Sequence, residues 1–268
     1  MDRKDGAMAL SREPHVLVVG GSDSSGGAGI ARDIETISSL GVRTCIAVTA
    51  VTVQTHEAVL ETHHLPPGLL ADQMRAALQA NKVAAIKIGM LATEQIIAAV
   101  AAVLRENRHI PAVLDPVLAS SSGRPLLEAG AIGTLTRDLM PLCCLVTPNL
   151  VELAPLAGSP LAVDDEEVLQ QGQGLLGAGP QALLIKGGHA AGLRSTDILL
   201  RPRQQPIRFD APRLVGSMRG TGCMLASAIA AHLAKTRSLE EAVCQGKQFV
   251  FMKLRGAQTS RRRIVLFA

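Results

Sequence analysis

The chain has 268 residues, of which 47% are hydrophobic and 19% are charged. This length allows one large α/β domain with a substantial buried core, and no run approaches the roughly 18 consecutive apolar residues of a membrane span. The polar start of the chain lacks an apolar signal core, so we expect a cytoplasmic protein without a membrane partner. Five cysteines without a CxxC pair indicate reduced thiols rather than a disulfide framework or a zinc site.

The formal net charge of +4 comes from the end of the chain. Residues 255–268 carry four arginines and no acidic residue, and without these four the chain has 23 basic and 23 acidic residues. The chain has no Trp, no Tyr and only 4 Phe, so aromatic platforms for base stacking are nearly absent. We therefore expect no nucleic-acid partner and interpret the basic end as a solvated tail.

Strand-like and helix-like segments alternate along the chain. Short aliphatic and β-branched runs predict strands at 15–21, 43–51, 58–65, 84–89, 111–116, 143–149, 181–188, 196–200 and 206–210. Helical patterns occupy 27–41, 66–80, 93–107, 150–156, 164–178, 221–235 and 238–256.

Apolar strands separated by helices are typical of a parallel sheet covered on both faces, and the last two strands suggest an antiparallel pair. No repeat, linker or low-complexity block divides the chain. We predict one α/β domain over 15–257. A polar extension at 1–14, expected to be disordered, precedes it, and a basic tail at 258–268 follows it.

The glycine-rich stretch GGSDSSGGAGIARD (20–33) follows the first predicted strand. In such a sheet ligands bind beyond the carboxyl ends of the strands. The stretch lacks the GK[ST] ending of a P-loop and the third glycine of a dinucleotide fingerprint. Its exposed amides suit the close approach of a small ligand, toward which Asp33 could point back. An ordinary glycine turn, with Asp33 complementing the helix dipole, fits the residues equally well.

Two further strand ends carry candidate binding residues. Gln54 offers both a donor and an acceptor and could read the edge of a heterocycle. A glutamine in that position is more often a solvated loop residue. Met90, in KIGML (87–91), is most simply a core residue and only secondarily a pocket wall.

Acidic and basic residues follow three later strands, in DPV (115–117), TPNLVEL (147–153) and KGGH (186–189). Asn149 and Glu152 are three positions apart and share a helix face. Glu152 could hold Mg²⁺ directly or through water, or it could be a plain helix-start carboxylate. The lysine of KGGH is a plausible partner for a polyphosphate.

The segment SMRGTGCM (217–224) runs into a helical pattern. The amides of Gly220, Thr221, Gly222 and Cys223 would point outward at a helix N-terminus, where the helix dipole favours negative charge. Phosphoryl transfer requires mainly positioning and charge stabilisation, which such amides, a lysine and Mg²⁺ can supply. Taken alone, the motif fits a helix cap of small residues equally well.

Six motifs together resemble those of a known family in order and spacing: GSDSSGGAGIARD, KIGML, DPV followed by SSGRPLL, TPNLVE, KGGH and GTGC. They resemble the hydroxymethylpyrimidine/phosphomethylpyrimidine kinases of thiamine biosynthesis, in the ribokinase-like superfamily, over about residues 14–257. The resemblance implies a mostly parallel central sheet flanked by helices on both faces. It also implies phosphorylation of 4-amino-5-hydroxymethyl-2-methylpyrimidine and then of its monophosphate, with ATP and Mg²⁺ as cosubstrates, and commonly a homodimer.

The resemblance also assigns roles to residues. It places the pyrimidine near Gly21, Ala28, Asp33, Gln54, Met90 and Val117. Asp33 and Gln54 would hydrogen-bond the ring, and Met90 and Val117 would wall its faces. It places ATP across Asn149, Glu152, Lys186, Gly188 and the GTGC loop. Asp115 and Glu152 would lie near the metal, and Lys186 would stabilise charge on the transferring phosphate.

Cys223 takes a specific meaning from the same resemblance. Similar sugar kinases of the superfamily carry an aspartate base at this position, and a carboxylate would repel an acceptor that is already a phosphate. A thiol is neutral when protonated, and its pKa, about 8.5 when free, falls at a helix N-terminus. We therefore expect Cys223 to be a near-neutral replacement for the base that suits two successive acceptors.

Two features depart from the family pattern. Members usually have histidine just before GTGC, where this chain has Arg219, which we expect to lie on the surface rather than to bind phosphate. The chain ends AQTSRRRIVLFA, where members often have a glycine-rich segment.

Two alternative functions stay open. One is a pyridoxal kinase on the same scaffold, although similar pyridoxal kinases tend to have an apolar residue at the position of Gln54. The other is a non-catalytic pyrimidine-binding sensor, against which the intact Lys186, Glu152 and GTGC argue.

Overall fold

The computed structural model describes residues 13–265 apart from positions 121, 178, 188–192 and 215–217. Its strands form a nine-stranded sheet in the order β3-β2-β1-β4-β5-β6-β7-β8-β9. The strands are β1 (His15–Ser22), β2 (Arg43–Gln54), β3 (Val59–His64), β4 (Val83–Ile88), β5 (Ala112–Leu114), β6 (Leu145–Val146), β7 (Leu183–Ile185), β8 (Arg194–Leu200) and β9 (Ile207–Pro212).

The sheet is mostly parallel. Strands β2, β1, β4, β5, β6 and β7 pair in parallel, and the pairs β2–β3, β7–β8 and β8–β9 are antiparallel. Val18 in β1 lies between Ile46 in β2 and Lys87 in β4. The predicted mostly parallel α/β sheet is therefore confirmed, as is the antiparallel pair near its end.

Helices connect the strands. They are α1 (Gly29–Ser39), α2 (Pro67–Ala80), α3 (Glu94–Glu106), α4 (Ala131–Thr134), α5 (Leu150–Leu156), α6 (Asp165–Gly177), α7 (Thr221–Ala234) and α8 (Leu239–Val265). Nowhere in the described ranges does a helix combine the length and the apolar character that crossing a bilayer requires.

Local signals in the sequence explain several helix ends. Pro67 occupies the first turn of α2, where its missing N–H costs nothing. Thr93 caps α3, because its side-chain oxygen accepts a hydrogen bond from the Ile96 amide at 3.2 Å. Gly41 follows α1 with a φ of 68°, a conformation that glycine adopts without strain.

Two helical segments differ from the sequence-based expectation. No element was predicted between 117 and 142, yet α4 continues into a π-helical turn (Leu135–Leu139) and a 3-10 turn (Met140–Leu142). This run forms because it buries Ala131, Leu135 and Leu139 in the same apolar core as the buried face of α3. Helix α8, predicted over 238–256, continues to Val265.

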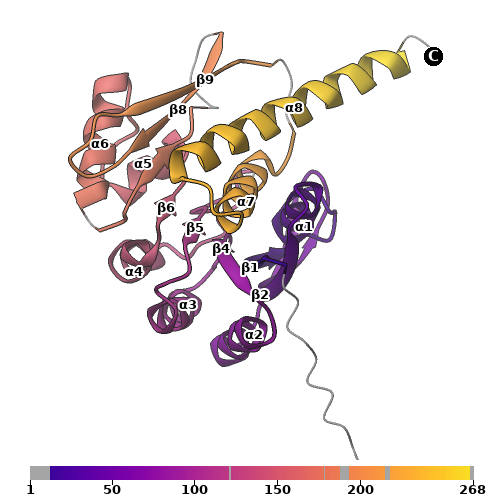
Figure 1. The fold of residues 1–268 in the computed structure, drawn as a ribbon, viewed down its shortest axis with the longest axis vertical. Coiled ribbons are helices and arrows are strands. Elements are labelled where there is room, and N and C mark those ends of the chain that lie inside the picture. The colour runs from indigo at the N-terminus through magenta and orange to yellow at the C-terminus, as the bar shows by residue number, and fades with distance from the viewer. Residues whose placement is uncertain (1–12, 121, 178, 188–192, 215–217, 266–268) are drawn as a thin grey trace, which may run out of the picture.

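The sheet separates two apolar cores. Alternate residues of each strand point to opposite faces, so Leu17 and Val19 join the core with α2 and α3, whereas Val16 and Val18 join the core with α1 and α7. Figure 1 shows α2, α3 and α4 on one side of the strands and α1, α7 and α8 on the other. Because the central strands are parallel, their carboxyl ends lie together at one end of the sheet.

Candidate active site

The GTGC loop leads into α7 and packs directly on the glycine turn after β1. Gly220, the N-cap of α7, has a φ of 73° and offers no side chain to cap the helix. A Cβ on Gly220 would lie 2.6 Å from the Gly27 carbonyl oxygen and 3.2 Å from the Ala28 Cα. The close approach requires glycine, and it leaves the first amides of α7, from Thr221 onward, available to an anion.

Three charged residues from successive strand ends meet beside this loop. Lys186 follows β7, Asp115 follows β5, and Glu152 lies in the first turn of α5. The Lys186 Nζ lies 2.7 Å from Asp115 Oδ1 and 3.5 Å from Glu152 Oε2, and the three side chains are 12%, 3% and 13% exposed. A Cβ on Gly222 would lie 3.3 Å from Lys186 Nζ and 3.5 Å from Asp115 Oδ2. The helix N-terminus and this charge cluster therefore share one site.

The charges of the cluster depend on one another. Burial alone would raise the pKa of Asp115, but the ammonium groups of Lys186 and Lys87 outweigh burial and hold it below its usual value. Burial would lower the pKa of Lys186, but Asp115 and Glu152 outweigh it and raise that pKa. Burial, helped by Asp115, raises the pKa of Glu152 against the effect of Lys186. Lys186 is therefore a fixed positive charge in the site.

Asn149 and Glu152 form a capping box at the start of α5. The Asn149 side chain accepts a hydrogen bond from the Glu152 amide at 2.8 Å, and Glu152 Oε2 accepts one from the Asn149 amide at 2.7 Å. Glu152 is thus a helix-start carboxylate that also faces Lys186. The strand-like bridge between Asn149 and Lys186 brings both segments to the same edge of the sheet.

The protein side chains of this site suit a magnesium ion only together with phosphate oxygens from a substrate. Within the described ranges, no cluster of three or more His, Cys, Asp and Glu side chains is arranged to hold a metal. Asp115 and Glu152 supply two carboxylates that share one lysine. Mg²⁺ typically keeps several waters and binds one or two carboxylates plus phosphate oxygens, so these two residues suit it.

The expected acceptor residues lie on the neighbouring strand ends. A Cβ on Gly21 would lie 2.9 Å from the Met90 sulfur, so glycine is required where Met90 packs over the end of β1. Ala28 contacts the GTGC loop beside Gly220. Val117 lies three residues beyond the end of β5, and its amide donates to the Asp115 carbonyl oxygen at 2.9 Å. The predicted Gly188 lies outside the described residues.

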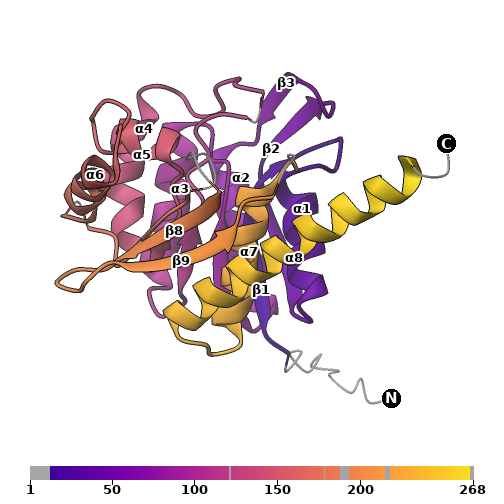
Figure 2. The same cartoon turned by 90° about the horizontal axis from the view of Figure 1, so that it is seen from above.

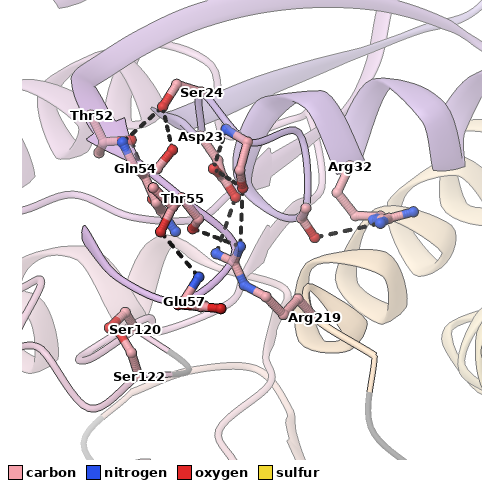
Figure 3. Close-up of polar contacts among 12 residues, drawn as sticks. Asp23, Ser24, Arg32, Thr52, Gln54, Thr55, Glu57, Ser120, Ser122 and Arg219 are labelled. Atoms are coloured by element: carbon pink, nitrogen blue, oxygen red, sulfur yellow. Dashed lines mark hydrogen bonds and ion pairs between the residues drawn. The ribbon is translucent and has the colours of Figure 1, made fainter. Parts of the chain in front are cut away.

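Gln54 ends β2, and the turn after β1 fixes its backbone. The Ser24 hydroxyl donates to the Gln54 carbonyl oxygen at 2.8 Å and accepts from the Gln54 amide at 2.8 Å. The Thr52 hydroxyl lies 3.2 Å from Gln54 Oε1. These contacts hold Gln54 more firmly than a solvated loop residue (Figure 3).

Asp33 does not take the place that the sequence suggested. Its side chain is buried, and it accepts hydrogen bonds from Lys87 Nζ at 2.9 Å and from the Ser227 hydroxyl at 2.7 Å, one on each carboxylate oxygen. Each oxygen thus already accepts one hydrogen bond from the protein, and Asp33, which is fully buried, links α1 to β4 and α7. Sequence reasoning missed Lys87, although a lysine inside the aliphatic strand AAIKIG was a visible signal.

The Cys223 thiol also differs from its expected state. Burial raises its pKa to about 12, and the Lys87 ammonium opposes this rise only in part. The sequence-based expectation was a pKa lowered by the helix N-terminus, but loss of hydration outweighs the helix dipole here. At neutral pH the thiol is protonated and carries no charge.

Arg219 is not a free surface side chain, contrary to the sequence-based expectation. Its guanidinium Nη1 donates to the Ser25 hydroxyl at 3.0 Å and to the Thr55 carbonyl oxygen at 3.1 Å, and Nη2 donates to Asp23 Oδ2 at 3.2 Å. Figure 3 shows this guanidinium between the turn after β1 and the tip of the β2–β3 hairpin. The partners lie far away in the sequence, so no local pattern could reveal them.

The matching family model and the curated relatives agree on one family. A family model described as phosphomethylpyrimidine kinase matches residues 23–264. The hydroxymethylpyrimidine/phosphomethylpyrimidine kinase of Mycobacterium tuberculosis is 44% identical over 249 residues, which cover 91% of this chain and 89% of that protein.

Two solved structures are also similar. The phosphomethylpyrimidine kinase of Clostridium difficile has a TM-score of 0.78 at 31% identity and covers 91% of this chain and 100% of its own. The pyridoxal kinase of Staphylococcus aureus in complex with AMP-PCP and pyridoxal has a TM-score of 0.80 at 31% identity, covering 89% of this chain and 86% of its own.

Proposed function

We propose a function for this chain from the fact that it belongs to the phosphomethylpyrimidine kinase family. It transfers a phosphoryl group from ATP to 4-amino-5-hydroxymethyl-2-methylpyrimidine. It then transfers a second phosphoryl group to the resulting monophosphate. The observation that carries this proposal is the uncapped N-terminus of α7 beside the Lys186–Asp115–Glu152 cluster. Such a site binds and stabilises phosphate charge, which is the main requirement of phosphoryl transfer.

ATP is the proposed donor, because a similar pyridoxal kinase has been solved with AMP-PCP. The amides at the start of α7 and the Lys186 ammonium would stabilise charge on the transferring phosphoryl group. Asp115 and Glu152 would hold Mg²⁺, which neutralises phosphate charge when bound. Asn149 would help to place the nucleotide at the same edge of the sheet.

The acceptor would lie between the turn after β1 and the strand ends of β2 and β4. Gln54 has both a donor and an acceptor for the edge of an aminopyrimidine. Gly21 and Ala28 leave room at the ring, and Met90 and Val117 would cover its faces.

The two acceptors place different demands on Cys223. In the first step an acceptor hydroxyl oxygen attacks the γ-phosphorus, the bond from that phosphorus to ADP breaks, and the hydroxyl proton would pass to an oxygen of the transferred phosphoryl group or to water, since the Cys223 thiol is already protonated. In the second step the attacking phosphate oxygen is already ionised, so no base is needed. A thiol that stays protonated at neutral pH adds no negative charge beside this phosphate, unlike an aspartate.

We further propose that the protein is a homodimer that uses the β2–β3 hairpin. Figure 2 shows this hairpin at one edge of the molecule. It exposes three large apolar side chains, Val51, Val53 and Leu60, which are 47%, 46% and 55% exposed. Several large exposed apolar side chains on one hairpin are consistent with an interface between two copies of the chain.

A coupled assay of ADP release tests the function directly. The protein is incubated with ATP, Mg²⁺ and one of three acceptors: the hydroxymethylpyrimidine, its monophosphate or pyridoxal. We expect turnover with both pyrimidines. Turnover with pyridoxal alone would assign the chain to the pyridoxal kinase activity of its structural neighbours, and no turnover with any acceptor would support a binding sensor.

A further inference from the structure

Arg219 joins three segments of the proposed site. It directly precedes the GTGC loop, and it donates to Asp23 and Ser25 in the turn after β1 and to the carbonyl oxygen of Thr55 at the hairpin tip. Its side chain is 23% exposed and that of Asp23 is 4% exposed. The ion pair is therefore shielded from most of the solvent and has a defined geometry, unlike a surface pair.

Asp23 is built to receive this guanidinium. Its Oδ1 accepts hydrogen bonds from the Ser25 amide at 2.9 Å and from the Ser25 hydroxyl at 2.6 Å, which shape the turn. Its Oδ2 accepts from Arg219. A buried carboxylate is costly without a counter-charge, so removal of Arg219 would destabilise the turn itself.

The guanidinium also rests against the backbone of the turn. A Cβ on Gly27 would lie 3.1 Å from Arg219 Nη1, and a Cβ on Gly220 would lie 2.6 Å from the Gly27 carbonyl oxygen. The glycine turn and the GTGC loop are therefore in van der Waals contact. Arg219 connects them by hydrogen bonds at the same place.

The same connection reaches Gln54. Thr55, which accepts from Arg219, is the next residue in the chain, and Ser24 in the turn binds the Gln54 backbone on both its carbonyl and its amide. Arg219 and Ser24 thus hold the hairpin tip from two sides (Figure 3). The group proposed to read the pyrimidine is linked to the loop proposed to bind phosphate.

We propose that Arg219 is a positioning residue that holds Gln54, beside the tip of the β2–β3 hairpin, at a fixed position relative to the GTGC loop. This inference rests on the proposed function for its kinetic consequence. The acceptor ring and the phosphoryl group must meet at a fixed separation, and a displacement of about 1 Å can cost about 100-fold in rate.

Arginine suits this role because its planar guanidinium has five N–H donors in a rigid fork. Arg219 donates three hydrogen bonds, two to the turn after β1 and one to the hairpin tip. An imidazole has at most two N–H donors and a shorter reach, so it would not make the same three contacts. Arg219 therefore connects the turn and the hairpin and is not an isolated surface charge.

Steady-state kinetics of Arg219→Ala, Arg219→Lys and Asp23→Asn test the proposal. We expect Arg219→Ala to lower kcat/KM for both pyrimidine acceptors by about 10- to 100-fold, with the KM for ATP changed less than about twofold. Asp23→Asn should have a similar effect. The double variant should be no worse than the more damaging single variant, because both changes break one connection. Arg219→Lys should lie between wild type and Arg219→Ala.

Other kinetic outcomes would overturn the proposal. If Arg219→Ala impairs only the monophosphate acceptor and Asp23→Asn is harmless, the guanidinium binds the acceptor phosphate directly. If neither variant changes kcat/KM, the contacts have no function. Arg208→Ala is the matched control, since it also removes an arginine from an ion pair, with Asp165, but one whose side chains are 43% and 73% exposed.

Hydrogen exchange gives a second readout that does not depend on activity. In Arg219→Ala the amides of residues 23–28 and 54–58 should exchange faster than in wild type, whereas those of α6 should not change. Unchanged exchange in the two segments would refute the connection even if the kinase is active. A wild-type protein that phosphorylates neither pyrimidine would refute the proposed function but leave the exchange test intact. Should Arg219→Ala fail to fold, Arg219→Lys and Asp23→Asn give the same comparison.

Discussion

Replacement of Lys186 by methionine should separate the structural and catalytic roles of the charge cluster. Methionine has a similar volume but no charge, so Asp115 and Glu152 would be left as two buried carboxylates without the cation they share. Breaking a buried ion pair by removal of one partner costs about 3–5 kcal/mol. In a chain of this size each 1 kcal/mol lowers Tm by roughly 2–4 °C, so we expect a Tm about 6–20 °C below wild type at pH 7.

The pH dependence of this loss follows from the pKa shifts. In wild type the pKa of Asp115 is lowered, so the stability that its ionised form contributes is present above the unfolded pKa and is lost as pH falls through the folded pKa. In Lys186→Met the buried Glu152 has no cation and Asp115 keeps only the Lys87 ammonium, so the pKa values of both carboxylates rise and the folded state binds protons more tightly than in wild type. The difference in unfolding free energy between wild type and Lys186→Met should therefore become smaller as the pH is lowered from 7 to 5.

Urea unfolding followed by circular dichroism at pH 7 and pH 5 measures both effects. The double variant Lys186→Met/Asp115→Asn should recover part of the lost stability, because it also removes one unpaired charge. It should not recover activity, since the charge that stabilises the transition state is still missing, and we expect kcat to fall about 100- to 1000-fold. A Lys186→Met protein as stable as wild type at pH 7, or a difference that does not shrink at pH 5, would refute the reasoning.

Three further predictions concern the GTGC loop. Gly222→Ala should leave Tm within a few degrees of wild type but lower kcat about 10-fold or more, because its Cβ would lie 3.3 Å from Lys186 Nζ. Gly220→Ala should lose both stability and activity, because alanine is strained at the φ of 73° that Gly220 adopts. Thermal melts and steady-state kinetics distinguish the two variants. Cys223→Asp should still phosphorylate the hydroxymethyl substrate but lose at least about 10-fold in kcat/KM on the monophosphate by charge repulsion; equal activity on the monophosphate would contradict this. Because burial raises the pKa of Cys223 to about 12, its proton stabilises the folded state fully below the unfolded pKa near 8.5, and this stability is lost as pH rises toward 12. Alkylation by iodoacetamide at pH 8, read by peptide mass spectrometry, should therefore modify exposed Cys244 much faster than Cys223.

The fold could be predicted well from the sequence because its signals are local. Aliphatic strands, helical periodicity and residues such as Pro67 and Gly41 report on their own neighbourhood in the chain. The order of strands and helices then restricted the fold to an α/β sheet with its site at the carboxyl ends of the strands. The run at 131–142 was missed because it is short and depends on burial against α3.

The site was predicted in part. The sequence pattern singled out the GTGC loop, Lys186 and Glu152, and the family resemblance added Asp115; the structure brings these residues together because they follow neighbouring strands of a parallel sheet. The sequence could not predict that Asp33 binds Lys87, since these residues are 54 positions apart and the pairing depends on how α1 packs on β1, the strand beside β4.

Charge state and long-range contacts were decided only by the tertiary structure. The helix N-terminus suggested a lowered pKa for Cys223, but burial of the thiol reverses the direction. The sequence shows that an arginine precedes GTGC, and the folded chain brings Arg219 to Asp23 from 196 positions away. Hydrophobic patterns and turn residues act within a few positions, whereas desolvation and ion pairing depend on which distant segments meet.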